Sequence, residues 1–106
     1  SPDNSMMYVT MNLSGKVASW DLVNNKAGKS VKTGKAARSL AISSDGTALF
    51  VVNFVSDTMS KVRTSDMKVL QNIKVCNEPI GITYDSPTSR TWVACYGGSV
   101  KIFDNK

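Results

Sequence analysis

The sequence predicts an all-β protein built from short antiparallel strands, and three observations lead to this prediction. Turn residues recur about every 8–12 positions along the 106-residue chain, and β-branched and aromatic residues dominate the runs between them. No stretch keeps the roughly 3.6-residue apolar period of a helix. No apolar run approaches the roughly 18–20 residues that cross a membrane.

The chain repeats itself with a period of 42 residues. SPDNSMMYVTM at 1–11 corresponds to SSDGTALFVVN at 43–53, and DSPTSRTWVAC at 85–95 follows at the same spacing. Later in the third copy one residue is missing, so that VKIFD at 100–104 corresponds to VASWD at 17–21. A period near about 40–45 residues is typical of architectures that stack similar units.

Each unit is predicted to hold four strands. The first strand, which ends at a turn with Asp-Gly or Ser-Pro chemistry, is RSLAIS at 38–43 or PIGITY at 79–84. The second strand is SMMYVTM at 5–11, ALFVVNFV at 48–55 or RTWVACY at 90–96. The third is KVASWDL at 16–22, TMSKVRT at 58–64 or SVKIFD at 99–104. The fourth is KSVKTG at 29–34 or LQNIKVC at 70–76.

The second strand indicates how the units pack. MMYVTM and LFVVNFV are nearly continuous apolar runs, as expected of strands covered on both faces. A strand in a sandwich or barrel has one wet or lumenal face, whereas a propeller blade lies between two neighbours. We therefore predict β-propeller blades of four antiparallel strands. Large residues that recur at equivalent positions are expected between blades: Tyr8, Phe50 and Trp92 at one position, and Trp20, Val62 and Phe103 at another.

The stretch RSLAISSDGTALFVVNFVSDTMSKVRTSDMKVLQNIKVCNEPIGITYD resembles the YVTN-type β-propeller repeat family. MYVTMN, LFVVNF and WVACYG match the second-strand signature of that family approximately, and the resemblance covers essentially the whole chain. The chain departs from the pattern at SSDG for SPDG, at Arg63-Thr64 where an Asp is usual, and at Cys76 where a Gly is usual. The resemblance implies an extracytoplasmic setting (periplasmic, cell surface or secreted), but no particular function, because such repeats occur in proteins of many roles.

The predicted strands make about two and a half blades. Residues 1–38 would form the second, third and fourth strands of one blade, residues 39–80 a full blade, and residues 81–106 the first three strands of another. Closed propellers typically have about 4–8 blades, so 1–106 is expected to be an incomplete ring and a segment of a longer chain, with a domain-swapped oligomer as the alternative. The isolated segment should self-associate, because its end blades expose apolar faces.

The chain has no histidine, which excludes a Ser-His-Asp triad, a Cys-His dyad and an imidazole metal ligand within it. Asp3 and Asp45 occupy matching turns, and Asp21 and Asp104 occupy matching strand ends, so both pairs are interpreted as structural. No two carboxylates are local enough for general acid–base work. We expect no catalytic residue, metal site or cofactor in this chain, and whether the parent protein is an enzyme stays open.

Candidate binding residues lie where the loops that join blades meet the loops between second and third strands, since these share one face of a propeller. They are Arg38, Lys35, Asn53, Asn77, Glu78 and Tyr96. Arg38 stands at the entrance to a first strand, nearest the central channel, and is the leading candidate for a ligand or partner contact. The alternative is a solvated arginine paired with a carboxylate of a neighbouring blade. Asn53 and Glu78 alone are too few for calcium, which needs about six oxygens or more.

Five basic residues follow one another in KAGKSVKTGKAAR, namely Lys26, Lys29, Lys32, Lys35 and Arg38. With a formal net charge of +5, they permit contact with a polyanion such as nucleic acid or an acidic envelope polymer. The interpretation we favour is an outermost strand that lysines protect against edge pairing. No aromatic residue is interleaved, so we do not expect nucleic acid as the partner.

Two cysteines, Cys76 and Cys95, are too few for a disulfide scaffold. The repeat places both near one face, with Cys95 opposite Glu78 or Pro79. They form either a disulfide, which would indicate an oxidising compartment, or two buried free thiols, and both alternatives stay open.

The sequence therefore predicts a non-catalytic binding scaffold that presents its inter-blade loop face to a protein or envelope polymer, or contacts the remaining blades of the same protein. One alternative is part of a propeller enzyme, such as a lactonase-like hydrolase or a cofactor-dependent oxidoreductase, whose active residues lie in other blades. The other is polyanion binding through the basic residues from Lys26 to Arg38.

Overall fold

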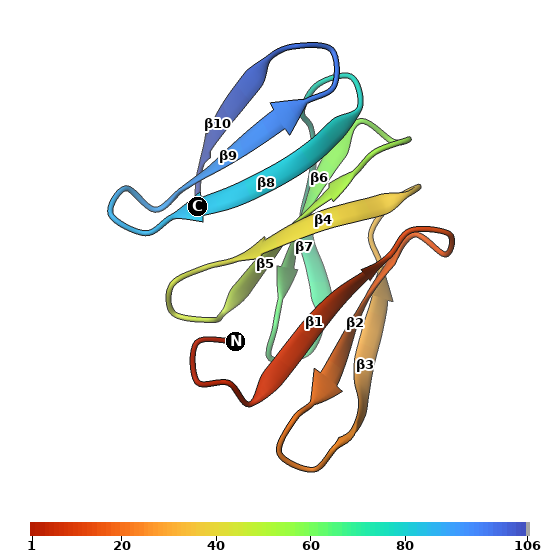
Figure 1. The fold of residues 1–106 in the computed structure, drawn as a ribbon, viewed down its shortest axis with the longest axis vertical. Helices are drawn as coiled ribbons and strands as arrows, with labels where there is room; N and C mark the ends of the chain where they lie inside the picture. Colours follow the sequence, from red (N-terminus) through yellow and green to blue (C-terminus); the bar gives the residue numbers. More distant parts are fainter. Residues whose placement is uncertain (106) are drawn as a thin grey trace.

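The computed structural model describes residues 1–105 as ten strands in three antiparallel sheets (Figure 1). The first sheet holds β1 (Met6–Met11), β2 (Lys16–Asp21) and β3 (Lys26–Lys32). The second holds β4 (Ala37–Ile42), β5 (Ala48–Asn53), β6 (Thr58–Arg63) and β7 (Lys68–Lys74). The third holds β8 (Pro79–Asp85), β9 (Arg90–Cys95) and β10 (Val100–Asp104). The predicted fold class, all-β with blade-like antiparallel sheets, is confirmed.

Strand ends differ from the prediction by one to three residues. β3 and β7 begin at Lys26 and Lys68, earlier than expected, because these residues pair with the ends of β2 and β6 across tight hairpins. β5 and β9 end at Asn53 and Cys95, because the residues that follow turn toward the next strand. Within the described residues, no helix is long and apolar enough to cross a membrane.

Two matching turns owe their shape to one aspartate each. The Asp45 carboxylate accepts hydrogen bonds from the Ser43 hydroxyl (2.7 Å) and from the backbone N–H and hydroxyl of Thr47 (3.0 and 2.7 Å). Forty-two residues earlier, Asp3 accepts the equivalent bonds from Ser1 and Ser5. This local satisfaction of polar groups explains why the same residue types recur at the same place in the repeat.

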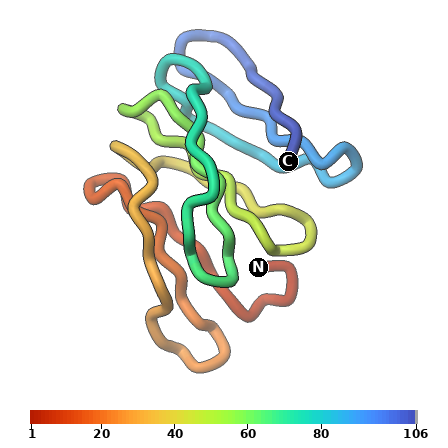
Figure 2. The backbone as a smooth tube through the Cα atoms, turned by 180° about the vertical axis from the view of Figure 1, so that it is seen from behind, coloured from red at the N-terminus to blue at the C-terminus, as the bar shows by residue number. Residues whose placement is uncertain are grey.

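The three sheets are stacked like adjacent blades. β1, β4 and β8 lie side by side on one side of the molecule, and β3, β7 and β10 lie on the opposite side, seen from behind in Figure 2. One apolar cluster fills the space between the first and second sheets and is built around Val17, Leu49, Val51 and Val62. A second cluster, built around Phe50, Val52, Met59 and Val93, fills the space between the second and third sheets.

Burial of the second strands follows their place in the stack. Every residue of β5 is buried, as the sequence predicted for a strand with two dry faces. In β1 and β9 the pattern alternates instead: every second residue is half-buried in β1 and buried in β9, and the residues between them are exposed, in line with the expected open face of each end blade. The reason is that only the middle sheet has a neighbour on both sides among the described residues.

Tyr8 and Phe50 face the sheet that follows their own, and Trp92 points the same way in the third sheet. Tyr8 packs against the cluster between the first and second sheets. Phe50 packs in the next cluster and stacks on Tyr84, with ring centroids 5.8 Å apart. Trp92 occupies the same repeat position, but 42% of it is exposed, because none of the described residues covers that side of the third sheet.

Candidate functional site

One edge of the molecule carries the turns 12–15, 54–57 and 96–99 and the linkers 33–36 and 75–78. Figure 1 and Figure 2 show these five segments on the same side, and we call this surface the loop face. The turns join the second and third strands of each sheet, and the linkers join one sheet to the next. It is the face on which the sequence placed its candidate binding residues.

Both linkers are held by hydrogen bonds to the turn 54–57. The backbone N–H of Lys35 donates to the Ser56 hydroxyl, and that of Glu78 donates to the Asp57 carboxylate, both at 2.8 Å. Ala36 and Glu78 occupy the same repeat position, and both have a positive φ, 60° and 55°. The linkers are therefore fixed to the neighbouring turns, which gives the loop face a defined shape.

Arg38 is exposed at the start of β4, and its guanidinium lies over the Phe54 ring, 5.0 Å from the centroid. A cation in this position is attracted by the negative face of the ring. The alternative, an ion pair with a carboxylate of a neighbouring blade, is not found, because the only ion pairs of the described residues are Arg63–Asp66 and Arg90–Asp104. Arg38 is thus oriented by an aromatic ring and remains exposed.

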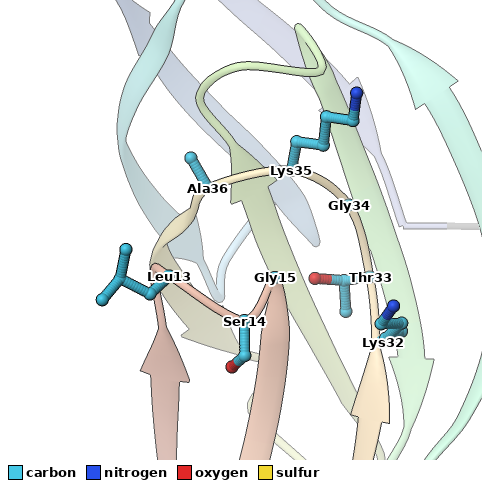
Figure 3. A pocket seen from close by; sticks show the side chains of 8 residues that line it. All are labelled: Leu13, Ser14, Gly15, Lys32, Thr33, Gly34, Lys35 and Ala36. Atoms are coloured by element: carbon cyan, nitrogen blue, oxygen red, sulfur yellow. The ribbon is translucent and has the colours of Figure 1, made fainter.

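A hollow of about 330 Å³ opens on the loop face between the first turn and the first linker (Figure 3). It is lined by Leu13, Ser14, Gly15, Lys32, Thr33, Gly34, Lys35 and Ala36. Gly15 has φ +63°, and a Cβ there would come within 2.4 Å of the Gly34 carbonyl oxygen, so the close approach of turn and linker requires glycine. The hollow combines an apolar rim at Leu13 with two lysine side chains.

Asn53 does not belong to the exposed part of this face, contrary to the sequence prediction. Its side chain is completely buried, and its amide oxygen accepts a hydrogen bond from the Thr33 hydroxyl at 2.9 Å. Its amide nitrogen donates to the hydroxyls of Thr58 and Ser60, at 3.1 and 3.0 Å. The amide therefore joins the linker after the first sheet to the second sheet, and no polar atom is left for a ligand.

Cys76 and Cys95 form a disulfide, with Cα atoms 6.2 Å apart. In the repeat, these two positions correspond to Gly34 and Asn53. A Cβ on Gly34 would lie 2.8 Å from the Asn53 side chain, so the two positions touch at the first junction as well. The buried Asn53 amide thus lies at the junction of the first and second sheets, and a disulfide occupies the equivalent place between the second and third sheets.

The remaining predicted residues are exposed on the loop face. Lys35 and Asn77 occupy the same repeat position in the two linkers, and Glu78 follows Asn77. Tyr96 begins the third turn, its backbone N–H donates to the Glu78 carbonyl oxygen (2.9 Å), and 70% of the residue is exposed. The structure therefore brings Glu78 and Tyr96 together, whereas Lys35 and Arg38 lie at the other junction.

Two apolar residues of this face escaped the sequence analysis. Leu13 is fully exposed and Val55 is 59% exposed, and both occupy the same position in their turns. An apolar residue in the hairpin turn between a second and a third strand was the available signal. Together with Tyr96 they place an exposed large side chain in the turn of each sheet.

Possible metal ligands and basic residues are both scattered over the described part of the chain. The chain contains no histidine, and no group of three or more Cys, Asp or Glu that could hold a metal ion occurs in residues 1–105. The basic residues are also divided: Lys26, Lys29 and Lys32 lie on β3, at the outer edge of the first sheet, whereas Arg38 is on β4 of the second.

Comparison with solved structures shows that the chain is similar to segments of β-propellers. It aligns with the hydrazine synthase of Kuenenia stuttgartiensis at 27% identity and a TM-score of 0.94, over 98% of this chain and 30% of that one. It aligns with U3-55K at 16% identity (TM-score 0.87, 97% and 33% covered). The β-propeller domain of Cps50 (Swd1) from Myceliophteria thermophila matches at 15% identity (TM-score 0.85, 98% and 33% covered).

These likenesses define the class of the protein: it is a partial β-propeller. The chain spans about a third of the length of the solved chains that it matches. No protein-family model matches it, and no curated protein matches it either.

Proposed function

We propose that the chain is a non-catalytic interaction scaffold whose loop face binds a protein partner. The observation that carries this proposal is the exposed large side chain in the turn of each sheet, at Leu13, Val55 and Tyr96. Exposed apolar groups gathered on one face are typical of protein-binding sites.

The composition of the loop face supports the proposal. Tyrosine and arginine are the residue types that contribute most to binding energy at protein interfaces. Tyr96 supplies one and Arg38, oriented by Phe54, supplies the other. Lys35 and Glu78 add charges of both signs around the apolar groups, as in the polar rim of an interface.

The test uses a random peptide library displayed on phage and selected on the immobilised chain. Binding energy at interfaces is concentrated in residues such as tyrosine and arginine, so we expect the selected binders to contact the loop face. Substituting Tyr96→Ser or Arg38→Ala should lower the affinity of the chain for the selected peptides by about tenfold or more, as measured by fluorescence anisotropy.

The matched control is Val23→Ser, in the turn between β2 and β3 on the opposite side of the molecule, where Val23 is 74% exposed. This variant should bind the peptides as the parent chain does. Peptides that lose affinity with Val23→Ser, and keep it with Tyr96→Ser and Arg38→Ala, would place the binding surface elsewhere and refute the proposal.

The proposal also concerns the cellular compartment of the protein and the family of its repeat. We propose that the chain is a YVTN-type repeat protein of the extracytoplasmic space. The repeat signature supports the family, and the Cys76–Cys95 disulfide supports the setting, because disulfides persist in oxidising compartments. Alkylation of the protein taken directly from its source, with and without reductant, tests the setting: two thiols that react without reductant would contradict it.

A second candidate function is the propeller part of an enzyme, and the 27% identity to a hydrazine synthase favours it. In that case this chain would supply scaffold only, and residues elsewhere in the protein would carry out the reaction. Purifying the native protein and assaying it for redox activity, alongside the isolated chain, distinguishes the two. Activity in the native protein alone supports the enzyme candidate, and its absence from both favours the scaffold.

A further inference from the structure

Positive charge borders the hollow between the first turn and the first linker. Lys32 and Lys35 both line it, and both are exposed. Lys16 follows Gly15 of the same hollow and lies directly opposite Lys32 in the pairing of β2 with β3. No aspartate or glutamate among the described residues lines the hollow. Like charges placed opposite each other on paired strands repel, so a bound negative charge would relieve this repulsion.

The chain does not neutralise these lysines itself. None of the ion pairs within residues 1–105 involves a lysine. Asp3 and Asp21 lie at the far end of the first sheet from the loop face, where Asp21 pairs with Met6. Asp57 belongs to the turn that holds the first linker, but its carboxylate accepts the backbone N–H of Glu78 at the second junction. The lysines of the hollow are therefore free to meet an anionic group of a partner.

The basic character belongs to the first junction and not to the repeat in general. Three equivalent positions differ between the junctions: Gly15, Lys35 and Ala36 at the first become Asp57, Asn77 and Glu78 at the second. Positions 32 and 74 are lysine in both. The first junction thus carries a net positive charge on these positions, whereas the second carries a net negative one.

The hollow also has a fixed shape and an apolar side. The backbone N–H of Thr33 donates to the Gly15 carbonyl oxygen at 2.9 Å, which holds the linker against the turn. Figure 3 shows the Leu13 side chain on one side of the hollow and Lys32 and Lys35 on the other. A site that is already formed loses little conformational freedom on binding. The hollow can therefore take an apolar group and a negative charge side by side.

We infer that the hollow binds an acidic peptide segment of the protein partner, in which a large aliphatic side chain is flanked by carboxylates. The aliphatic side chain packs on Leu13, and the carboxylates meet Lys32 and Lys35. The volume of about 330 Å³ lies at the lower end of the range of about 300–1,000 Å³ for ligand sites, which suits a short segment. The inference rests on the proposed function, because it names the class of segment that one part of the loop face binds.

The probe is a short fluorescent peptide that contains Glu-Leu-Glu and is blocked at both ends, so that only its side chains carry charge. The reference peptide contains Gln-Leu-Gln instead. In fluorescence anisotropy at low salt, the parent chain should bind the acidic peptide about tenfold more tightly than the reference. Added salt should remove most of this difference, because it screens charges at the surface.

Substitutions in the hollow locate the contact. Lys35→Asn introduces the residue that the second junction carries, and it should lower the affinity for the acidic peptide by about threefold while leaving that for the reference peptide unchanged. Lys32→Gln is a second variant with the same expectation. Leu13→Ser should weaken both peptides, since it removes the apolar contact that they share. Lys68→Asn is the matched control, because it removes an exposed lysine at the start of β7, away from the loop face, and should bind both peptides like the parent.

Equal affinities of the parent for the acidic and the reference peptide would overturn the inference. Equal losses with Lys35→Asn and Lys68→Asn would also overturn it, because they would show a general effect of charge. The inference and the proposed function fail separately. Library peptides that bind through Tyr96 and Arg38 but contain no acidic residue would support the loop face as a binding site and refute the assignment of the hollow.

Discussion

Single carboxylates set the acid stability of the two matching turns. Asp3 and Asp45 are exposed, yet hydrogen bonds from neighbouring hydroxyl and backbone N–H groups lower the pKa of each to about 2. Ser5 is the main cause at Asp3, and Ser43 is the main cause at Asp45. These bonds stabilise the charged form of the carboxylate, and the unfolded chain has no equivalent of them.

The expected consequence is a loss of stability in acid. Because the folded pKa values lie below the unfolded ones, the turns contribute stability above about pH 4, and this contribution is lost as the pH falls through about 2. Urea unfolding of the Asp3→Asn, Asp45→Asn double variant should therefore show a weaker pH dependence in that range than the parent. Equal pH dependence of parent and variant would mean that the two turns do not cause it.

At the scale of elements, the two junctions between successive sheets are held by different pairs of residues. The linker after β3 meets the end of β5 through Gly34 and Asn53, and the linker after β7 meets the end of β9 through Cys76 and Cys95. The backbone places both pairs close together, so different pairs of residues can occupy the same two positions of a junction. The disulfide also fixes the linker that carries Glu78 on the loop face.

This equivalence predicts that Gly34→Cys with Asn53→Cys forms a second disulfide. A closed loop of this length contributes about 3 kcal/mol, whereas removing the buried Asn53 amide costs about 1–3 kcal/mol, so the free energy of unfolding should change little. The measurement is intact mass after alkylation of the denatured, oxidised protein, which should show no modified thiol. Gly34→Cys alone is the control and should be alkylated once. Two modified thiols in the double variant would show that the junctions differ.

At the scale of the whole molecule, each sheet contacts only its neighbours, and the charge is spread over the stack. Repeat proteins of this kind derive their stability from the units and from the contacts between neighbouring units. The net charge of +5 is not concentrated in one surface, because the lysines of β3 lie at an outer edge and Arg38 lies on the next sheet. Protection of this sheet edge against pairing explains why β3 carries three lysines, so a polyanion partner is not needed to account for them.

Duplex DNA should accordingly bind weakly. If only the three lysines of β3 meet phosphates, the slope of log affinity against log salt should be no steeper than about three, and binding should vanish near physiological salt. Filter binding of a short duplex across salt concentrations measures this, with Lys26→Ser, Lys29→Ser, Lys32→Ser as the matched variant. Tight binding with a much steeper slope, abolished in that variant, would restore the polyanion alternative.

The architecture could be read from the chain because its signals are local and repeated. Turn residues such as Asp45, the apolar run of β5 and the 42-residue period each reflect chemistry within a few residues, and together they specify blades and their order. The loop face could be located in the same way, since hairpin turns and linkers alternate along the chain.

Which residues are exposed to solvent depends on contacts between segments that lie far apart in the sequence. Asn53 was predicted to belong to the loop face, but its burial depends on Thr33 and Ser60, which reach it from a linker and from another strand. The exposure of Met7 and Trp92 likewise depends on which faces are covered by a neighbouring sheet. The packing of the second and third sheets also brings Cys76 and Cys95 together. Periodicity specifies the form of a repeat, whereas burial is a property of the junctions, and a junction exists only once two sheets have packed together.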